Sequence, residues 1–177
     1  SATTISASDE AVFVGFQSAD SIEFASGNVP TSLRPGVPCV IGSLNATDGM
    51  PMTGMFFGGS DSGDTCRVNG IAVAHDATLV CAVGTYKGDS LPISAAATLH
   101  PIDSSKASAF VVCYTGPNNG GAGPYTLAWA SGSQFDAATY LPEGGTAATA
   151  TGIEMDADRA YVTGLYYSSN IEWGSDT

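Results

Sequence analysis

One stretch of this sequence is written twice, and the repeat constrains the fold more than any other feature. The stretch AVFVGFQSADSIEFASG begins at Ala11, and AYVTGLYYSSNIEWGSD begins at Ala160. The two align without a gap, so that Gly15 matches Gly164. A match of this length at a fixed offset within one chain is typical of repeated supersecondary units. We therefore expect the chain to contain several copies of one structural unit.

A third copy, VCAVGTYKGDSLPIS, lies between the first two. It carries Gly84 at the position of Gly15 and Gly164. In every copy the residue nine positions after the glycine is large and apolar, namely Phe24, Ile93 and Trp173. We treat residues 1–177 as a single domain with units over approximately residues 1–69, 70–151 and 152–177, of which the last is partial.

Each unit opens with two short strands joined by a tight turn. Apolar and polar residues alternate in TTISASDEAVFVGF, GIAVAHDATLVCAVG and GIEMDADRAYVTG, as they do in half-buried strands. Two more strands are expected in the first unit, VPCVIGSL and MPMTGMFFGG, and two in the second, SAFVVCYTG and GPYTLAWAS. No stretch has a convincing helical period. The sequence therefore predicts an all-β fold with four antiparallel strands in each complete unit.

The repeat also resembles a known family. The runs GIEMDADRAYVTGLYYSSNIEW, SAFVVCYTG and GPYTLAWAS are similar to the seven-bladed β-propeller repeat. Units of that family read roughly Gly-Ile-Ala-Val-Asp, a turn, Tyr-Val-Thr-Gly, Ala-Phe-Val and a later Trp. The turn here lacks the Gly-Asn usual in the family, and the third unit stops before its Ala-Phe-Val part. The resemblance implies propeller blades, but it implies no single activity, because propellers host many.

The number of units does not suffice for a closed propeller. Closed rings have typically about four to eight blades, and this chain supplies two units and part of a third. Open sheet edges expose unpaired backbone groups that bind other strands. We therefore expect an incomplete ring, completed by the remainder of a longer polypeptide or by other chains. A single β-sandwich that arose by duplication is the alternative fold.

The charge disfavours two classes of partner, and the hydropathy predicts no membrane span. Five Lys and Arg stand against seventeen Asp and Glu, so the formal net charge is −12. This charge disfavours nucleic acids and anionic membranes. No apolar run approaches the roughly 18 residues of a membrane span, so no membrane span is expected in this chain.

The cysteines indicate an oxidising compartment, and we expect a secreted or cell-surface protein. None of the four, Cys39, Cys66, Cys81 and Cys113, belongs to a CxxC pair, so disulfides are preferred to a zinc site. Cys81 and Cys113 fall on neighbouring strands of one unit and are the expected pair, which leaves Cys39 with Cys66. Buried free thiols are the alternative. The sequon NAT predicts N-glycosylation at Asn45.

The sequence contains no convincing catalytic constellation. His75 lies in a predicted turn where the other units carry acidic residues, and His100 precedes Pro101 in a loop. The run GSDSG carries Asp61, not serine, at the centre of what would otherwise be a nucleophile elbow. We therefore expect no enzyme activity from this chain.

Two acidic loops are candidates for calcium, and no other cofactor is expected. Asp61 and Asp64 share the Gly-rich loop GGSDSGDT, while Asp156 and Asp158 share a turn. Carboxylate oxygens suit Ca²⁺, although neither loop has the spacing of an EF-hand. Ordinary turn chemistry is the simpler interpretation of all four residues.

An aromatic group near the end of the sequence is the remaining candidate site. Tyr166, Tyr167 and Trp173 lie close in sequence to Glu172. Aromatic side chains beside carboxylates suit sugar binding, whereas packing between units is the ordinary role of such residues. We expect a protein interface in preference to a sugar site.

Together these patterns predict a non-enzymatic structural or adhesive module, part of a larger secreted or cell-surface protein or of a filament. Its expected partners are other protein chains or the remainder of its own propeller. A carbohydrate- or glycoprotein-binding propeller is the first alternative. A fragment of a propeller hydrolase or lyase, with its catalytic residues in other blades, is the second.

Overall fold

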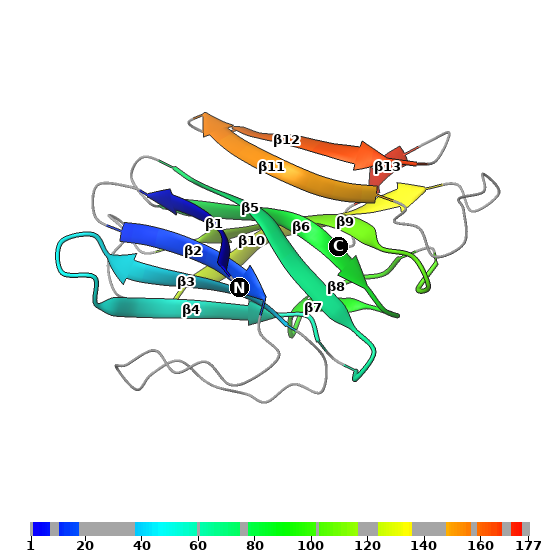
Figure 1. Cartoon of the computed structure of the whole chain (residues 1–177), viewed down its shortest axis with the longest axis horizontal. Coiled ribbons are helices and arrows are strands. Elements are labelled where there is room, and N and C mark those ends of the chain that lie inside the picture. Colours follow the sequence, from blue (N-terminus) through cyan, green and yellow to red (C-terminus); the bar gives the residue numbers. More distant parts are fainter. Residues whose placement is uncertain are drawn as a thin grey trace.

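Thirteen β-strands and no helix make up the described part of the chain (Figure 1). The structure is a computed structural model, and it describes residues 2–7, 11–17, 38–59, 61–74, 78–101, 103–116, 124–135, 148–156, 159–167 and 171–174. All strand pairs are antiparallel. The predicted all-β class is therefore confirmed.

The first unit forms a four-stranded meander, which we call the first sheet. Its spatial order, β1-β2-β3-β4, follows the chain order. Strands β2 and β3 pair from Ala11 opposite Asn45 to Gln17 opposite Cys39. All four strands were predicted, the first two from their alternating pattern, and they are β1 (Ala2–Ala7), β2 (Ala11–Gln17), β3 (Cys39–Asn45) and β4 (Pro51–Phe57).

The second sheet repeats this meander and adds one strand. Its order is β13-β10-β9-β6-β5. Four of its strands come from the second unit, namely β5 (Thr65–Val73), β6 (Leu79–Lys87), β9 (Ser108–Thr115) and β10 (Thr126–Phe135). The fifth, β13 (Ile171–Gly174), comes from the third unit. Between β6 and β9 the chain forms a small hairpin that the sequence did not predict, β7 (Leu91–Ser94) and β8 (Ala97–Leu99).

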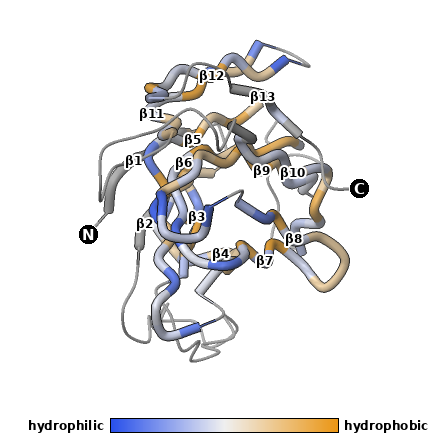
Figure 2. Tube along the Cα trace, turned by 90° about the vertical axis from the view of Figure 1, so that its right-hand side faces the viewer, coloured by the Kyte–Doolittle hydropathy of each residue, from blue (hydrophilic) through white to orange (hydrophobic). Residues whose placement is uncertain are grey.

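The third unit contributes a separate two-stranded hairpin, β11 (Ala148–Asp156) and β12 (Arg159–Tyr166). Figure 2 shows that this hairpin lies above the second sheet, while the first sheet lies on the other side. The first strands of the three units are neighbours, because β5 contacts both β1 and β11. The second sheet is therefore the middle layer of three.

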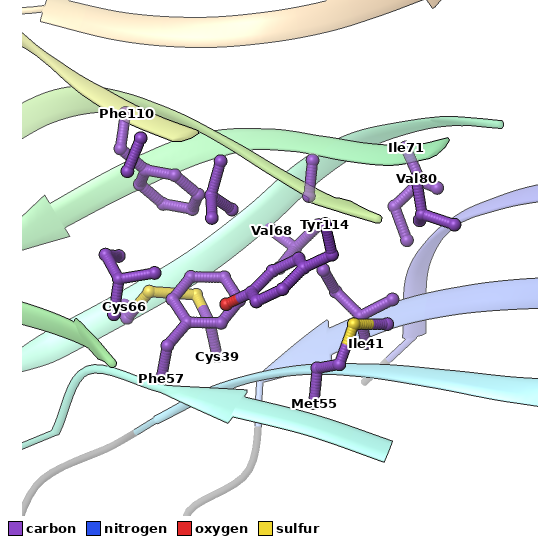
Figure 3. Close-up of a cluster of buried hydrophobic side chains, with 14 of the residues drawn as sticks. Cys39, Ile41, Met55, Phe57, Cys66, Val68, Ile71, Val80, Phe110 and Tyr114 are labelled. Atoms are coloured by element: carbon purple, nitrogen blue, oxygen red, sulfur yellow. A yellow bond between two sulfur atoms is a disulfide. The ribbon is translucent and has the colours of Figure 1, made fainter. Parts of the chain in front are cut away.

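The larger core lies between the first and second sheets (Figure 3). Phe57 meets the ring of Phe110 edge to face, with ring centroids 5.5 Å apart. Phe13 and Val80 are fully buried in the same core. A smaller core on the opposite face of the second sheet contains Cys81, Val83, Ala109, Val111, Cys113, Ala148 and Ala150. Burial on both faces explains why β6 and β9 read as nearly continuous apolar runs.

The repeated glycine has a steric function. A Cβ atom at Gly84 would collide with the carbonyl oxygen of Arg67, and one at Gly164 would collide with that of Thr149. The first strand of each unit has a register shift at this point, and these shifts lie between Ala2 and Thr4, Val68 and Gly70, and Ala150 and Gly152. An irregularity of this kind brings backbone close to the facing strand, where only glycine fits. The repeat observed in the sequence thus corresponds to a repeated feature of the backbone.

The units do not all pack in the same way. Ala11 and Phe13 of the first unit are equivalent in the repeat to Val80 and Ala82 of the second, and all four are buried in one core. Equivalent faces of these units therefore meet, as the inner faces of a sandwich do. Val162, the third equivalent of Phe13, packs instead against the opposite face of the second sheet. That front-to-back contact is the one that rotation about a propeller axis would produce, and the blade arrangement of the whole chain stays a prediction.

The strands also extend beyond the predicted unit boundaries. Strand β5 begins at Thr65 and β11 at Ala148, each several residues before the glycine at which we began the unit. The predicted turns at residues 8–10, 75–77 and 157–158 lie outside the described residues. Within the described residues, no helix has the length and apolar character needed to cross a membrane.

Candidate interaction surface

Both disulfides join the cysteines that the sequence analysis paired. Cys81 and Cys113 lie directly opposite each other on β6 and β9, with Cα atoms 4.1 Å apart. Cys39 and Cys66 connect β3 to β5, with Cα atoms 5.2 Å apart, and so join the first sheet to the second (Figure 3). All four cysteines are buried. Two such bonds suit an oxidising environment outside the cell.

The sequon lies at the tip of the β3–β4 hairpin. The Asn45 side-chain carbonyl accepts a hydrogen bond from the Thr47 N–H at 2.8 Å, which closes a tight Asx turn. Residues 46–50 are exposed. A glycan attached to Asn45 would extend into solvent from this tip, and its presence stays a prediction.

The acidic loop before β5 is stabilised by its own residues. Asp64 is buried, and its Oδ2 accepts the N–H of Asp61 at 2.9 Å. In return, the Asp64 N–H donates to the Asp61 carbonyl oxygen at 3.0 Å. Asp156 is exposed at the end of β11, and Asp158 lies outside the described residues. No group of three or more possible metal ligands occurs among the residues the structure describes, so calcium binding stays a prediction.

The remaining titratable candidates have ordinary structural surroundings. His100 is exposed after β8, and His75 lies outside the described residues. The hydroxyl of Ser105, 2.6 Å from Oδ1 of Asp103, and the Ser105 N–H hold the pKa of Asp103 below its usual value. Burial raises the pKa of Tyr125. Neither shift requires a catalytic role to explain it.

Large apolar side chains are exposed on three strands of one side of the molecule. We call this set the aromatic surface, and it consists of Trp129 on β10, Tyr161, Leu165 and Tyr166 on β12, Tyr167 directly after β12, and Trp173 on β13. The exposed fractions run from 45% for Trp129 to 57% for Tyr167. Large apolar side chains that gather on one side of a molecule mark interaction sites, whereas ones scattered singly are ordinary.

Half of this surface is predicted from the sequence, namely Tyr166, Tyr167 and Trp173, which cluster along the chain. Trp129 was not predicted, because WAS at the end of an apolar strand looks like ordinary core. Tyr161 and Leu165 on β12 were not predicted either. Apolar residues on both sides of β12 were the available signal, since a strand covered on one face alternates with polar residues.

The two tryptophans share one face of the second sheet. Trp129 lies opposite Cys113, and Trp173 lies opposite Ser133, four residues further along β10. Directly opposed residues of an antiparallel pair point to the same side of the sheet. Cys113 belongs to the smaller core beneath β11. Trp129 and Trp173 are therefore on the face that the third unit covers, yet both stay about half exposed.

A polar cluster explains why the third unit covers only part of this face of the second sheet. Asn69 on β5 donates to the Ala150 carbonyl at 2.8 Å and to the Thr85 hydroxyl at 3.2 Å. The hydroxyls of Thr85 and Thr149 lie 2.6 Å apart. These bonds fasten β11 over the inner strands, where it contacts β5, β6 and β9. The outer strands β10 and β13 are left with exposed tryptophans.

The geometry of this surface is the basis for functional inference. Comparison with models of protein families, with curated proteins and with solved structures finds no match. What the chain does must therefore be inferred from its own residues.

Proposed function

We propose that this chain is a non-enzymatic structural or adhesive module of the cell exterior, which joins other polypeptides through its third unit. The observation that carries the proposal is the aromatic surface on β10, β12 and β13. Tyr and Trp are enriched at protein interfaces, because they bury a large apolar area and keep a polar group that can bond at the rim.

The disulfides and the net charge support the extracellular part of the proposal. Two disulfides are buried, of which one joins the first sheet to the second and the other joins two strands of the second sheet. The net charge of −12 keeps separate molecules apart unless a specific surface brings them together. Both features fit a secreted or cell-surface protein, and a filament subunit is one form it would take.

We also propose that the four-stranded meander is a repeating blade. The equal strand order of the first unit and of β5, β6, β9 and β10 supports this, as does the front-to-back packing of the third unit on the second sheet. The meeting of equivalent faces in the first two units supports the sandwich alternative for that pair.

Carbohydrate binding is the second candidate. Exposed aromatic rings at Tyr166, Tyr167 and Trp173 favour it, because such rings stack on the apolar faces of sugars. For a hydrolase or lyase, no observation in the described residues offers comparable support.

A glycan array separates the two candidates. The unmodified chain, Tyr166→Ala and the control Met50→Ala are compared, because Met50 is exposed to a similar degree on the distant β3–β4 hairpin. The structural role predicts no glycan binding by any of the three. Glycan binding that disappears in Tyr166→Ala and persists in Met50→Ala would overturn it in favour of the sugar site.

Cross-linking in native material tests the structural role directly. Acidic residues far outnumber lysines, so a carboxyl-reactive cross-linker is appropriate. We expect peptides that contain Glu172 of β13 to be cross-linked to another polypeptide, with Asp48 at the exposed tip of the β3–β4 hairpin as the control. Cross-links confined to the chain itself would contradict the proposal.

A further inference from the structure

We infer that the open edge of β12, with the exposed tryptophans beside it, takes up a β-strand from a different polypeptide. The inference rests on the proposed structural role and states how the partner is held. The strand would pair with β12 as β3 pairs with β2 and as β9 pairs with β6.

The edge of β12 is the first observation. By the repeated glycine, β12 is the equivalent of β2 and β6. In both of those cases the second strand pairs along all or nearly all of its length with a third strand, β3 or β9. In the described part of the chain, β12 pairs with β11 alone. A strand edge of this length carries a row of backbone donors and acceptors that an extended peptide can satisfy.

The tryptophans are the second, independent observation. A strand added beside β12 would continue the third layer outward from β5, β6 and β9 toward β10. Trp129 and Trp173 lie on β10 and β13, on the face that this layer covers. Tyr166 lies opposite Ala148 and so shares the side of β12 that faces the second sheet. The added strand would cover these three rings at the same time as it bonds to β12.

The expected partner can be described by its chemistry. It is an extended segment that runs antiparallel to β12 and presents alternate apolar side chains to the second sheet, as β3 and β9 do in their own units. It is neutral or basic, because the chain carries a net charge of −12 and would repel an acidic segment.

A second copy of this chain is less suited than a different polypeptide to supply the strand that pairs with β12. The suitable strands of a second copy, β3 and β9, are already paired on both edges within the first and second sheets. To donate either one, the copy would have to open a sheet and expose its core. A segment that is extended and unpaired before binding has no such cost.

The test uses a synthetic peptide that copies Ser108–Thr115, with Ser in place of Cys113 and lysines at its ends for solubility. The chain has two tryptophans, and both belong to this surface. The peptide has none, so tryptophan emission reports on the site alone. We expect a saturable blue shift of the emission and weaker quenching by acrylamide as the peptide binds.

Two modified peptides test whether the peptide binds through backbone hydrogen bonds to β12. N-methylation at alternate residues removes the donors on one edge of a strand, and two peptides together cover both edges. We expect at least one of them to bind about tenfold more weakly or worse, which corresponds to the loss of about 1.4 kcal/mol. A peptide of the same composition in shuffled order serves as the control for unspecific apolar binding.

Variants of the chain test whether the two tryptophans contact the bound peptide. With a fluorescent peptide and anisotropy as the readout, Trp129→Ser and Trp173→Ser should each weaken binding by about tenfold or more, as central aromatic contacts do. Met50→Ser is the matched control, because Met50 is exposed to a similar degree but lies on the distant β3–β4 hairpin. It should bind like the unmodified chain, and circular dichroism checks that all three variants fold.

Three results would overturn the inference. Both N-methylated peptides could bind as tightly as the unmodified peptide, the shuffled peptide could shift the tryptophan emission equally, or the emission could show no saturable shift. A blue shift that grows with protein concentration without peptide would assign the place to a second copy instead. Peptide binding without any cross-linked partner in native material would support the strand-binding site and contradict the structural role. A cross-linked partner without peptide binding would support the structural role and contradict the strand-binding site.

Discussion

Replacing Cys39 and Cys66 together by alanine should lower the free energy of unfolding by about 3.5 kcal/mol. The disulfide closes a stretch of 27 residues, and its removal gives the unfolded chain the corresponding freedom. The bond also joins β3 to β5, so the first and second sheets would be held by side-chain packing alone at this point. Urea unfolding, followed by circular dichroism, measures the change.

The matched control is the double replacement of Cys81 and Cys113. That bond closes a similar stretch of 32 residues, but it joins strands that are also paired by backbone hydrogen bonds. We expect a similar loss of stability with the sheets still packed, whereas loss of the Cys39–Cys66 bond should also increase the exposure of the core to a hydrophobic dye. A Cys39 and Cys66 double variant that unfolds at the same urea concentration as the unmodified protein would disprove the inter-sheet role.

Gly84→Ala should destabilise the protein by about 3 kcal/mol or prevent folding, at the severe end of overpacking effects. The new methyl group would collide with the carbonyl oxygen of Arg67 and lie 2.8 Å from the ring of Phe110. Neither can move freely, because the first belongs to the backbone of β5 and the second is fully buried. The midpoint of thermal or urea unfolding measures the loss.

Gly63→Ala is the control for this substitution. Gly63 lies in the loop before β5, and a Cβ atom there would have no heavy atom within 4 Å. We expect its stability to stay within about 0.5 kcal/mol of the unmodified protein. If Gly84→Ala were as stable as Gly63→Ala, the steric explanation of the repeated glycine would be wrong.

The local structure was largely accessible from the sequence. Period-2 alternation predicted β2, β6 and their partners, because apolar side chains must fall on the buried face of each strand. The cysteine pairing followed from placing Cys81 and Cys113 on adjacent strands. The hairpin of β7 and β8 was missed, because strands of four and three residues are too short to display a period.

The relative packing of the units was not accessible. Alternation shows that Phe13 and Ala82 point to one face of their sheets, but it does not show whether those faces meet each other or a third layer. Exposure of Trp129 likewise depends on where β11 is fastened, and the bonds of Asn69 and Thr85 that fix it join residues far apart in sequence. Such tertiary contacts leave no local pattern.

The central feature of the molecule is a three-layer arrangement, in which the second sheet is covered on both faces and β12, within the described residues, is paired on one edge only. Residue-resolved amide hydrogen exchange on the isolated chain tests it most directly, because protection follows burial and pairing. Strands β6 and β9 are paired on both edges and covered on both faces, so their amides should exchange slowest. Amides on the outer edge of β12 should exchange far faster and become protected when the strand peptide is added. Equal protection of β12 and β6 in the isolated chain would contradict the account.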